Sequence, residues 1–441
     1  MEKLFKLRER GTTVSREIVA GLTTFLAMSY ILAVNPGMLS AVGGAMTFGA
    51  VFTATALSSA VATLVMAFVA NLPVALAPGM GLNAFFTFTV VLGMGISWQE
   101  ALTAVFLEGL LFIILSLVGV REAIINSIPE NLKKAVAVGI GLFITLIGLS
   151  NAGLASSETG TIVGFVALNN RPALLAVIGL VITIVLSVLK VHGAVLIGII
   201  VTTIIGIPLG VTVIPSGWNP VSLPAAPLFC QFDFGAIVAS SGAFWRFFTV
   251  FFTFLFVDMF DTIGTLMGVA TEANLVGKDG TIPRAKAALF ADAVGTSVGA
   301  MLGTSTVTSF VESSSGVAAG GRTGLTSMVT ALLFLIALFL SPLFALVPAA
   351  ATAPALIFVG FLMMKSVIGI NFSDVTEGIP AFITIMVMPF SYSIANGISW
   401  GIITYVITKL AGGKIKDIPV VTWILAVVFV FKMMLDAGVF S

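Results

Sequence analysis

Apolar runs of about bilayer-spanning length follow one another from end to end of this 441-residue chain. A helix needs about 20 predominantly apolar residues to cross the hydrocarbon core of a membrane. Only 9% of the residues are charged and 59% are hydrophobic, which leaves too little polar surface for a water-soluble domain of this size. We therefore expect an all-α polytopic membrane protein.

The apolar runs form two sets of seven. The first set is expected near residues 17–35, 48–70, 74–92, 101–120, 132–152, 173–189 and 193–211. The second set is expected near residues 246–270, 284–302, 304–320, 325–346, 350–369, 379–408 and 417–437. Residues 1–211 and 212–441 would then be two seven-span repeats, with about 14 spans in all. Because seven is odd, the second repeat has to cross the membrane in the inverted direction, as in many transporters.

The third run of each set is interrupted. Asn71–Val90 reads NLPVALAPGMGLNAFFTFTV, and Gly303–Ser327 reads GTSTVTSFVESSSGVAAGGRTGLTS. Gly, Pro and runs of small hydroxyl residues disfavour a continuous helix. Irregular backbone survives at membrane depth only where protein or a water-filled cavity satisfies its polar groups. Paired interruptions at corresponding positions therefore point to the substrate site of a transporter.

The distribution of Lys and Arg predicts the orientation of the chain. Basic residues are frequent before the first apolar run, and cytoplasmic segments carry an excess of such residues, so we expect a cytoplasmic N-terminus. The first run is long enough to be a retained span rather than the core of a cleaved signal peptide. Basic residues after spans four, six, eight and ten then also lie on the cytoplasmic side of the membrane. A plasma-membrane location is expected.

One segment does not fit this orientation. Lys409, Lys414 and Lys416 lie outside if residues 379–408 form one span. A proline and an Asn-Gly pair within that stretch would also allow two short helices, which would bring the three lysines inside. The sequence leaves both arrangements open, and also whether the last apolar run crosses the membrane or lies along its surface.

Several function classes are disfavoured by composition. The formal net charge of +1 gives no reason to expect nucleic-acid binding, and one cysteine (Cys230) and one histidine (His192) cannot form an internal disulfide, a thiolate cluster or a His-based metal site. The G-x-x-x-x-G-K-[ST] nucleotide motif is absent from the sequence. We therefore expect no enzyme activity, cofactor or metal, and any uphill transport must draw on an ion gradient.

Five carboxylates fall inside expected spans, where each costs about 2.5–3.5 kcal/mol on insertion scales and is a functional candidate by default. They are Glu108, Asp258, Asp261, Asp292 and Glu312. Asp258, Asp261 and Thr262 follow i, i+3, i+4 spacing and share one face of a helix. Two carboxylates one turn apart repel each other when both are ionised, so Asp258 or Asp261 is a candidate for holding a proton. Glu108 and Asp292 are expected to pair with structural neighbours.

Glu312 lies in the middle of the second interrupted segment, beside Ser313. A break in a helix exposes backbone N–H and C=O groups, and a carboxylate in that setting can accept hydrogen bonds from the ring N–H groups of a ligand. Asn83 offers an amide donor and acceptor from the first interrupted segment. Phe85 and Phe310, next to the two breaks, are candidates to stack on a flat ring.

Four stretches of the chain resemble one known family. They read REIVAGLTTFLAMSYILAVNP at 16–36, APGMGLNAFF at 77–86, VDMFDTIGTLMG at 257–268 and GTSTVTSFVESSSGVAAGGRTGLT at 303–326. The chain resembles the NCS2 (nucleobase–ascorbate) superfamily and, within it, the AzgA-like permeases for adenine, guanine and hypoxanthine. Four long motifs in the right order, spread over both halves, make the resemblance specific.

The resemblance implies a fold in which a core domain, spans 1–4 and 8–11, moves against a gate domain, spans 5–7 and 12–14. Spans 3 and 10 would each contain a short strand, and the two strands would meet at mid-membrane. Relatives of this kind often form homodimers through the gate domain, so a homodimer is a further expectation.

The resemblance also implies a set of site residues. The family's substrate-binding acidic residues fall on Asp258 and Glu312, and a second acidic position of span eight falls on Asp261. Uracil-type relatives carry His where this chain has Thr262, so we assign proton coupling to Asp258 or Asp261 instead. The expected purine site comprises Asp258, Glu312, Asn83, Thr262, Phe85 and Ser313.

The expected function is secondary active import of a purine base together with a proton. One alternative is an anion transporter or channel of the same architecture, such as a sulfate or bicarbonate carrier, although carboxylates at the breaks disfavour an anion. A second is an intramembrane enzyme, for which the chain lacks a nucleophile–base pair or metal cluster. A third is a nutrient sensor that binds its ligand without moving it.

Overall fold

The computed structural model describes residues 2–118, 129–156, 164–166, 170–273, 275, 282 and 284–436 of the chain. In the first half the helices are α1 Glu2–Phe5, α2 Val14–Met28, α3 Ile31–Leu39, α4 Phe48–Val65, α5 Met80–Ala84, α6 Trp98–Val118, α8 Glu130–Asn151, α9 Arg171–Val188 and α10 Ala194–Gly206. In the second half they are α11 Gly235–Val238, α12 Ser241–Glu272, α13 Ala285–Leu302, α14 Ser313–Ala318, α15 Gly324–Ala337, α16 Ser341–Ala345, α17 Ala349–Met364, α18 Val375–Phe390, α19 Ile394–Ala411 and α20 Val420–Asp436. The strands are β1 Leu76–Pro78, β2 Ala155–Ser156, β3 Gly164–Phe165 and β4 Val307–Ser309.

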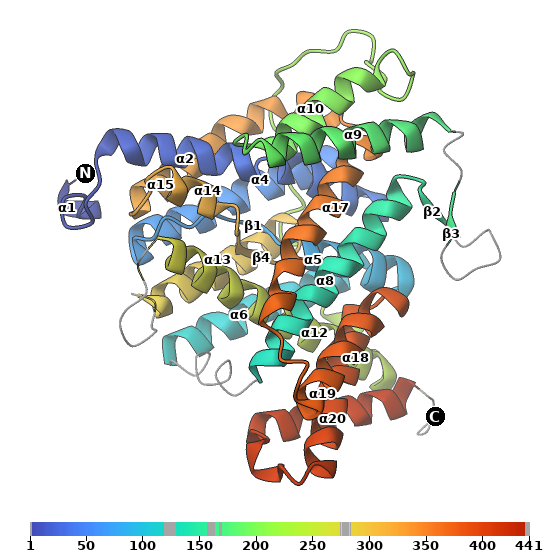
Figure 1. Ribbon diagram of the computed structural model, residues 1–441. Coiled ribbons are helices and arrows are strands. Elements are labelled where there is room, and N and C mark those ends of the chain that lie inside the picture. Colours follow the sequence, from blue (N-terminus) through green and yellow to red (C-terminus); the bar gives the residue numbers. More distant parts are fainter. Residues whose placement is uncertain are drawn as a thin grey trace.

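The expected class of fold is confirmed. Among the described residues, nine helical segments are long and apolar enough to cross a membrane, and shorter apolar helices accompany them. Expected span 101–120 corresponds to α6, and the last two residues of that expectation lie outside the described part of the chain. The helices form a bundle in which strands are few and short (Figure 1).

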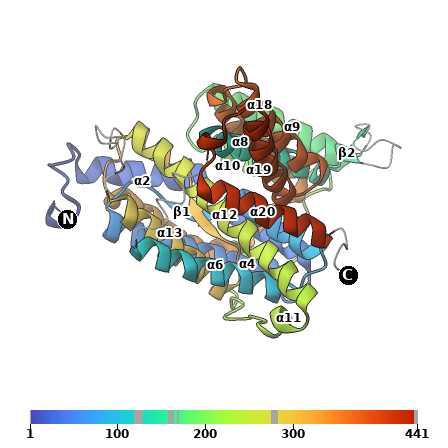
Figure 2. The ribbon, with the colours of Figure 1, turned by 90° about the horizontal axis from the view of Figure 1, so that it is seen from below.

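Two groups of helices pack mainly among themselves. One group contains α2, α4, α6, α13 and α15, and the other contains α8, α9, α10, α17, α18 and α19. Figure 2 shows members of the first group, α2, α4, α6 and α13, to one side of α8, α9, α18 and α19. The long helix α12 contacts both groups, through α6 on one side and α8 and α19 on the other.

The two interrupted spans meet at an antiparallel strand pair, as the resemblance implied. Strand β1 pairs with β4 in the register Leu76 opposite Ser309 and Pro78 opposite Val307 (Figure 1). The pairing continues past both strands, because Gly79 N–H donates to the carbonyl of Thr306 at 3.0 Å and Phe310 N–H to the carbonyl of Ala75 at 2.9 Å. Each broken segment thus supplies hydrogen-bond partners that the other lacks, which allows non-helical backbone at membrane depth.

The prediction that residues 379–408 form one span is wrong, and the two-helix arrangement is correct. Helices α18 and α19 lie against each other and are joined by a three-residue turn. Pro389 removes a backbone donor near the end of α18, and Tyr392 in the turn has a φ of 52°. Ser393 then caps α19 by accepting a hydrogen bond from the N–H of Asn396.

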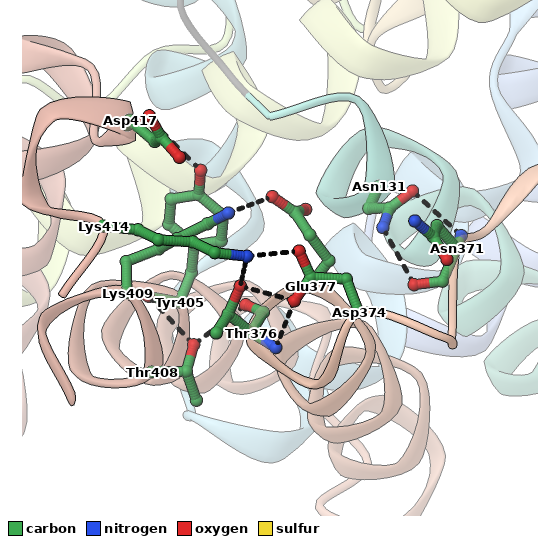
Figure 3. Close-up of polar contacts among 10 residues, drawn as sticks. All are labelled: Asn131, Asn371, Asp374, Thr376, Glu377, Tyr405, Thr408, Lys409, Lys414 and Asp417. Atoms are coloured by element: carbon green, nitrogen blue, oxygen red, sulfur yellow. Dashed lines mark hydrogen bonds and ion pairs between the residues drawn. The ribbon is translucent and has the colours of Figure 1, made fainter. Parts of the chain in front are cut away.

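This hairpin places the three lysines at the same end of the bundle as the start of α8. Figure 3 shows Lys414 bound to Asp374 and Lys409 bound to Glu377, with 2.6 Å between the charged atoms in each pair. Beside them, Asn131 at the start of α8 exchanges two hydrogen bonds with the backbone of Asn371. Lys409 in the last turn of α19 and Lys414 after that helix therefore share one face with the basic residues of early α8, in agreement with the rule that basic segments lie on one side.

The two ion pairs differ in burial, and this difference predicts different contributions to stability. The side chain of Lys409 is 4% exposed, whereas that of Lys414 is 40% exposed. The Lys414 ammonium holds the pKa of Asp374 well below its usual range, but exposed pairs contribute little to stability. We expect Lys409→Ala to lower the free energy of unfolding by about 2 kcal/mol. This is somewhat less than the loss for a fully buried pair, because Glu377 retains some access to water.

The measurement is the thermal melting of the two purified variants in detergent. Lys414→Ala serves as the matched control and should melt close to the unsubstituted protein. Equal melting temperatures for the two variants would contradict the assignment of a structural role to the buried pair.

Candidate functional site

A cavity of about 200 Å³ opens where the two interrupted spans meet. Its walls come from the β1–α5 break, the β4–α14 break, the middle of α12, and the facing sides of α8 and α17. Its polar lining consists of side chains of Tyr30, Asp261, Thr265, Thr308, Ser309, Glu312 and Ser366. The cavity is small compared with the roughly 300–1,000 Å³ of most ligand pockets, which suits a compact ligand.

Two carboxylates face this cavity from different elements. Glu312 lies at the N-cap position of the short helix α14, and its Oε1 accepts a hydrogen bond of 2.6 Å from the hydroxyl of Tyr30. Asp261 lies on α12, and its Oδ2 accepts a hydrogen bond of 3.2 Å from the hydroxyl of Thr308 in β4. Within the described part of the chain, each carboxylate accepts one hydrogen bond from the side chain of another residue and so retains acceptor capacity for a ligand.

The loop before β4 is held by three side chains from three different spans. Asn35 on α3 donates to the hydroxyl of Thr304 at 2.9 Å. Ser305 donates to the amide oxygen of Asn83, and Thr306 donates to the carboxylate of Glu108 at 3.0 Å. These contacts are buried, and together they fix the strand that carries Thr308 and leads to Glu312.

Asn83, expected in the purine site, makes its described contacts within the protein. Its amide nitrogen donates to the carbonyl of Pro78 at 3.2 Å, and its oxygen accepts from Ser305. The residue is fully buried and is not part of the cavity lining. Asn83 therefore links the first interrupted span to the loop that precedes β4.

Asp258 and Asp261 face different surroundings although they are one helical turn apart. Asp261 lines the cavity, whereas Asp258 is fully buried outside it. Thr262 donates at 3.1 Å to Asp258 and lies 2.6 Å from a carboxylate oxygen of Asp292 on α13. The cavity therefore brings Glu312 together with Asp261, while Asp258 and Thr262 belong to a second polar cluster with Asp292.

The two remaining expected residues also lie outside the cavity lining. The hydroxyl of Ser313 accepts a hydrogen bond of 3.0 Å from the N–H of Ala75, which connects the two breaks. Phe85 packs edge-on against Phe254 with ring centroids 4.9 Å apart. Phe310, by contrast, lines the cavity and provides an aromatic side chain beside the carboxylates.

Tyr30 and Thr308 are the principal cavity residues that the sequence did not single out. Tyr30 is one of only three tyrosines in the chain, and a hydroxyl within the first apolar run was the available signal. Thr308 belongs to the run of hydroxyl residues that marked the break. Its contact with Asp261 depends on a pairing between distant segments, which no local pattern specifies.

Comparison with known proteins gives a consistent result. Residues 15–399 match the model of a family described as "Permease family". The chain is 49% identical to a putative permease of Methanocaldococcus jannaschii, over 99% of both chains. It is 47% identical to the guanine/hypoxanthine permease PbuG of Bacillus subtilis, over 98% of both, and 43% identical to the adenine permease AdeP of Escherichia coli, over 98% of this chain and 96% of that one.

Solved structures share the fold at low sequence identity. The transmembrane domain of the cyanobacterial bicarbonate transporter BicA superposes with a TM-score of 0.65 at 16% identity, over 88% of this chain and 97% of that domain. The anion transporter Slc26a9 of mouse superposes with a TM-score of 0.60 at 13% identity, over 91% of this chain and 69% of that one. At these identities the likeness concerns the architecture alone.

Proposed function

Because this chain belongs to the NCS2 family of nucleobase permeases, we propose that it imports purine nucleobases, with adenine, guanine and hypoxanthine as the candidate substrates. The observation that carries the proposal is the pair of carboxylates, Glu312 and Asp261, in one small cavity between the two broken spans. Names of relatives at 43–47% identity, which are adenine and guanine/hypoxanthine permeases, support the same class of substrate.

The proposed binding mode follows from hydrogen-bonding capacity. A purine presents N–H donors along its ring edge, and Glu312 and Asp261 accept them, while Thr308 and the exposed backbone of the breaks complete the polar contacts. Phe310 packs against the flat face of the ring. In this mode Asp261 takes the contact that the sequence assigned to Asp258, and Asn83 acts by positioning the breaks.

An anion is a poorer fit to the same cavity. Two carboxylates repel a bicarbonate or sulfate ion, and the charged groups among the cavity-lining residues are both acidic. The resemblance to anion transporters concerns the fold alone. Proteins of one fold can bind different substrates because their site residues differ.

We further propose that transport is secondary active and driven by a proton gradient. One proton moving through 100 mV contributes about 2.3 kcal/mol, which is sufficient for modest accumulation. The helix group around α4, α6 and α13 would act as the core domain and the group around α8, α17 and α18 as the gate domain, since the cavity lies between them. A cytoplasmic N-terminus, a plasma-membrane location and a homodimer through the gate domain complete the proposal.

Direct binding tests the substrate class. Purified protein in detergent is incubated with radiolabelled guanine, adenine or hypoxanthine, and unlabelled competitors are added. We expect at least one purine to bind and to be displaced by other purines, whereas bicarbonate and sulfate leave binding unchanged. Binding of the anions in place of every purine would overturn the assignment.

Gly79→Ala is expected to reduce the rate of purine uptake about tenfold, because an added methyl group in a well-packed site usually costs about 1–3 kcal/mol. A Cβ at this position would lie 2.8 Å from the hydroxyl oxygen of Thr308 and 3.4 Å from a carboxylate oxygen of Asp261, so it would disturb their hydrogen bond. The measurement is the initial rate of labelled purine uptake. Gly37→Ala is the matched control, because a Cβ at Gly37 meets no atom within 4 Å. Equal loss in both variants would contradict the account.

A further inference from the structure

The walls of the cavity become more exposed toward one end of the bundle. Val359 on α17 is 7% exposed, whereas Ser366, in the turn that follows this helix, is partly exposed. Val257 on α12 is 1% exposed, whereas Thr265, two turns further along the same helix, is partly exposed. All four residues line the cavity. The cavity therefore opens toward the C-terminal ends of α12 and α17.

This open end of the bundle is the end that carries the lysine ion pairs. Lys134 on α8 donates to the carbonyl of Gly369 at 3.0 Å, so the start of α8 and the end of α17 lie together. Val136 and Ala137 line the cavity from α8 and are within about two turns of the start of this 22-residue helix. In the proposed orientation, with basic segments in the cytoplasm, the cavity is open to the cytoplasmic side.

Away from the lysines, the two helix groups are in contact. Ile140 on α8 packs directly against the backbone of α5, because a Cβ added at Gly81 would lie 2.6 Å from its Cγ2 atom. About one turn further along α8, the fully buried ring of Phe143 packs edge-on against Tyr392, with ring centroids 5.3 Å apart. The hydroxyl of Thr89 donates to the backbone carbonyl of Tyr392 at 3.3 Å. These contacts close the cavity on the side opposite the lysines.

The contact between Thr89 and Tyr392 joins the proposed core domain to the proposed gate domain. Thr89 lies on the helical segment Phe85–Gly93, which continues the first interrupted span and contacts α3 and α6. Tyr392 lies in the turn between α18 and α19, in the other helix group. Its φ of 52° is rare for a bulky residue, and such a backbone persists only where the surrounding contacts hold it. At 3.3 Å the hydrogen bond is long, which suits a contact that breaks in each transport cycle.

We propose that Thr89 and Tyr392 form an outer latch. The latch holds the end opposite the lysines closed while the cavity is open to the cytoplasm, and it separates when a purine enters from outside. This inference rests on the proposed function, because a transporter opens its site to each side of the membrane in turn. A contact made in only one of two states stabilises that state alone, so loss of the latch shifts the population toward the outward-open state.

Thiol labelling of the cavity measures which end is open and needs no purine. The single cysteine, Cys230, is replaced by Ser, and Ala137→Cys places one thiol in the cavity wall. A charged methanethiosulfonate that does not cross membranes is applied to intact cells and to inside-out vesicles. We expect this reporter protein to react mainly in inside-out vesicles. Adding Thr89→Val should raise the ratio of outside to inside labelling about two- to tenfold, the change in population expected from loss of one hydrogen bond.

Thr87→Val is the matched control on the same helical segment. Thr87 is fully buried, and its hydroxyl has no hydrogen-bond partner among the residues that the structure describes, so its loss should leave the labelling ratio unchanged. Thr89→Ser keeps a hydroxyl and should restore the ratio of the reporter protein. Ser366→Cys, also in the cavity wall, replaces Ala137→Cys as the reporter if the latter does not fold.

Three results would overturn the inference. They are an unchanged ratio in Thr89→Val, an equal change in Thr87→Val, and labelling of the reporter protein mainly from outside. The expected labelling pattern together with no flux of any purine would instead be a failure of the proposed function, because the labelling reports on the open end of the cavity and not on its ligand.

Discussion

Replacing Glu312 by Gln is expected to lower kcat/KM for purine uptake by roughly 100-fold, while the protein still reaches the membrane. The substitution keeps the size of the side chain but replaces one acceptor oxygen with an N–H₂ donor. A hydrogen bond to a charged group contributes about 1.5–3 kcal/mol, and a site built to bind polar groups discriminates strongly when one partner is wrong. The measurement is labelled purine uptake, normalised to the amount of protein in the membrane.

The control for this prediction is a carboxylate outside the cavity. Glu100 is buried in the first turn of α6 and does not line the cavity. Glu100→Gln should therefore leave the apparent affinity for purines near that of the unsubstituted protein. Normal uptake by Glu312→Gln would remove Glu312 from the binding site and with it the proposed binding mode.

Glu17→Ala is expected to destabilise the protein by about 4 kcal/mol or more, among the largest effects of a single substitution. The Glu17 carboxylate is fully buried on α2 and accepts hydrogen bonds from the backbone N–H groups of Arg322, Thr323 and Thr326 and from both threonine hydroxyls. These backbone donors belong to the start of α15 and the residues before it, where a negative charge is also favoured by the helix dipole. Loss of the carboxylate leaves several buried donors without partners.

The melting temperature of purified protein in detergent measures this effect. Glu17→Gln retains one acceptor oxygen and should lose less stability than Glu17→Ala. Glu9→Ala is the exposed control, since Glu9 is 64% exposed in its ion pair with Lys6 and should have little influence. A melting temperature for Glu17→Ala equal to that of Glu9→Ala would show that the network is not needed for the fold.

Much of the architecture could be predicted from the sequence because the membrane restricts the possibilities. Apolar runs of bilayer length predicted the helices, and Gly, Pro and hydroxyl residues indicated the positions of the two breaks. The turn between α18 and α19 was ambiguous, since a proline is compatible with either a kink or a helix end. In the structure the first helix ends at Phe390 and the second begins at Ile394, and ion pairs of Glu377 with Lys409 and of Asp374 with Lys414 join the two helices at one end.

The site was harder to predict, because residues one helical turn apart do not point in the same direction. Positions i and i+3 differ by about 60° around a helix axis, given 3.6 residues per turn. This difference turns Asp261 toward the cavity and leaves Asp258 beside Asp292. The partners of Thr304, Ser305 and Thr306 lie 198 to 269 residues away in the chain, so local patterns could not assign Asn83 its position between the breaks.

Uptake by purified protein in proteoliposomes tests the central claim most directly. Labelled adenine, guanine, hypoxanthine and uracil are offered separately, with and without an inward proton gradient, and labelled bicarbonate and sulfate are offered in parallel. The account predicts that at least one purine accumulates above its external concentration only when the gradient is present. Accumulation of an anion, with no flux of any base through protein that is folded and correctly inserted, would contradict it.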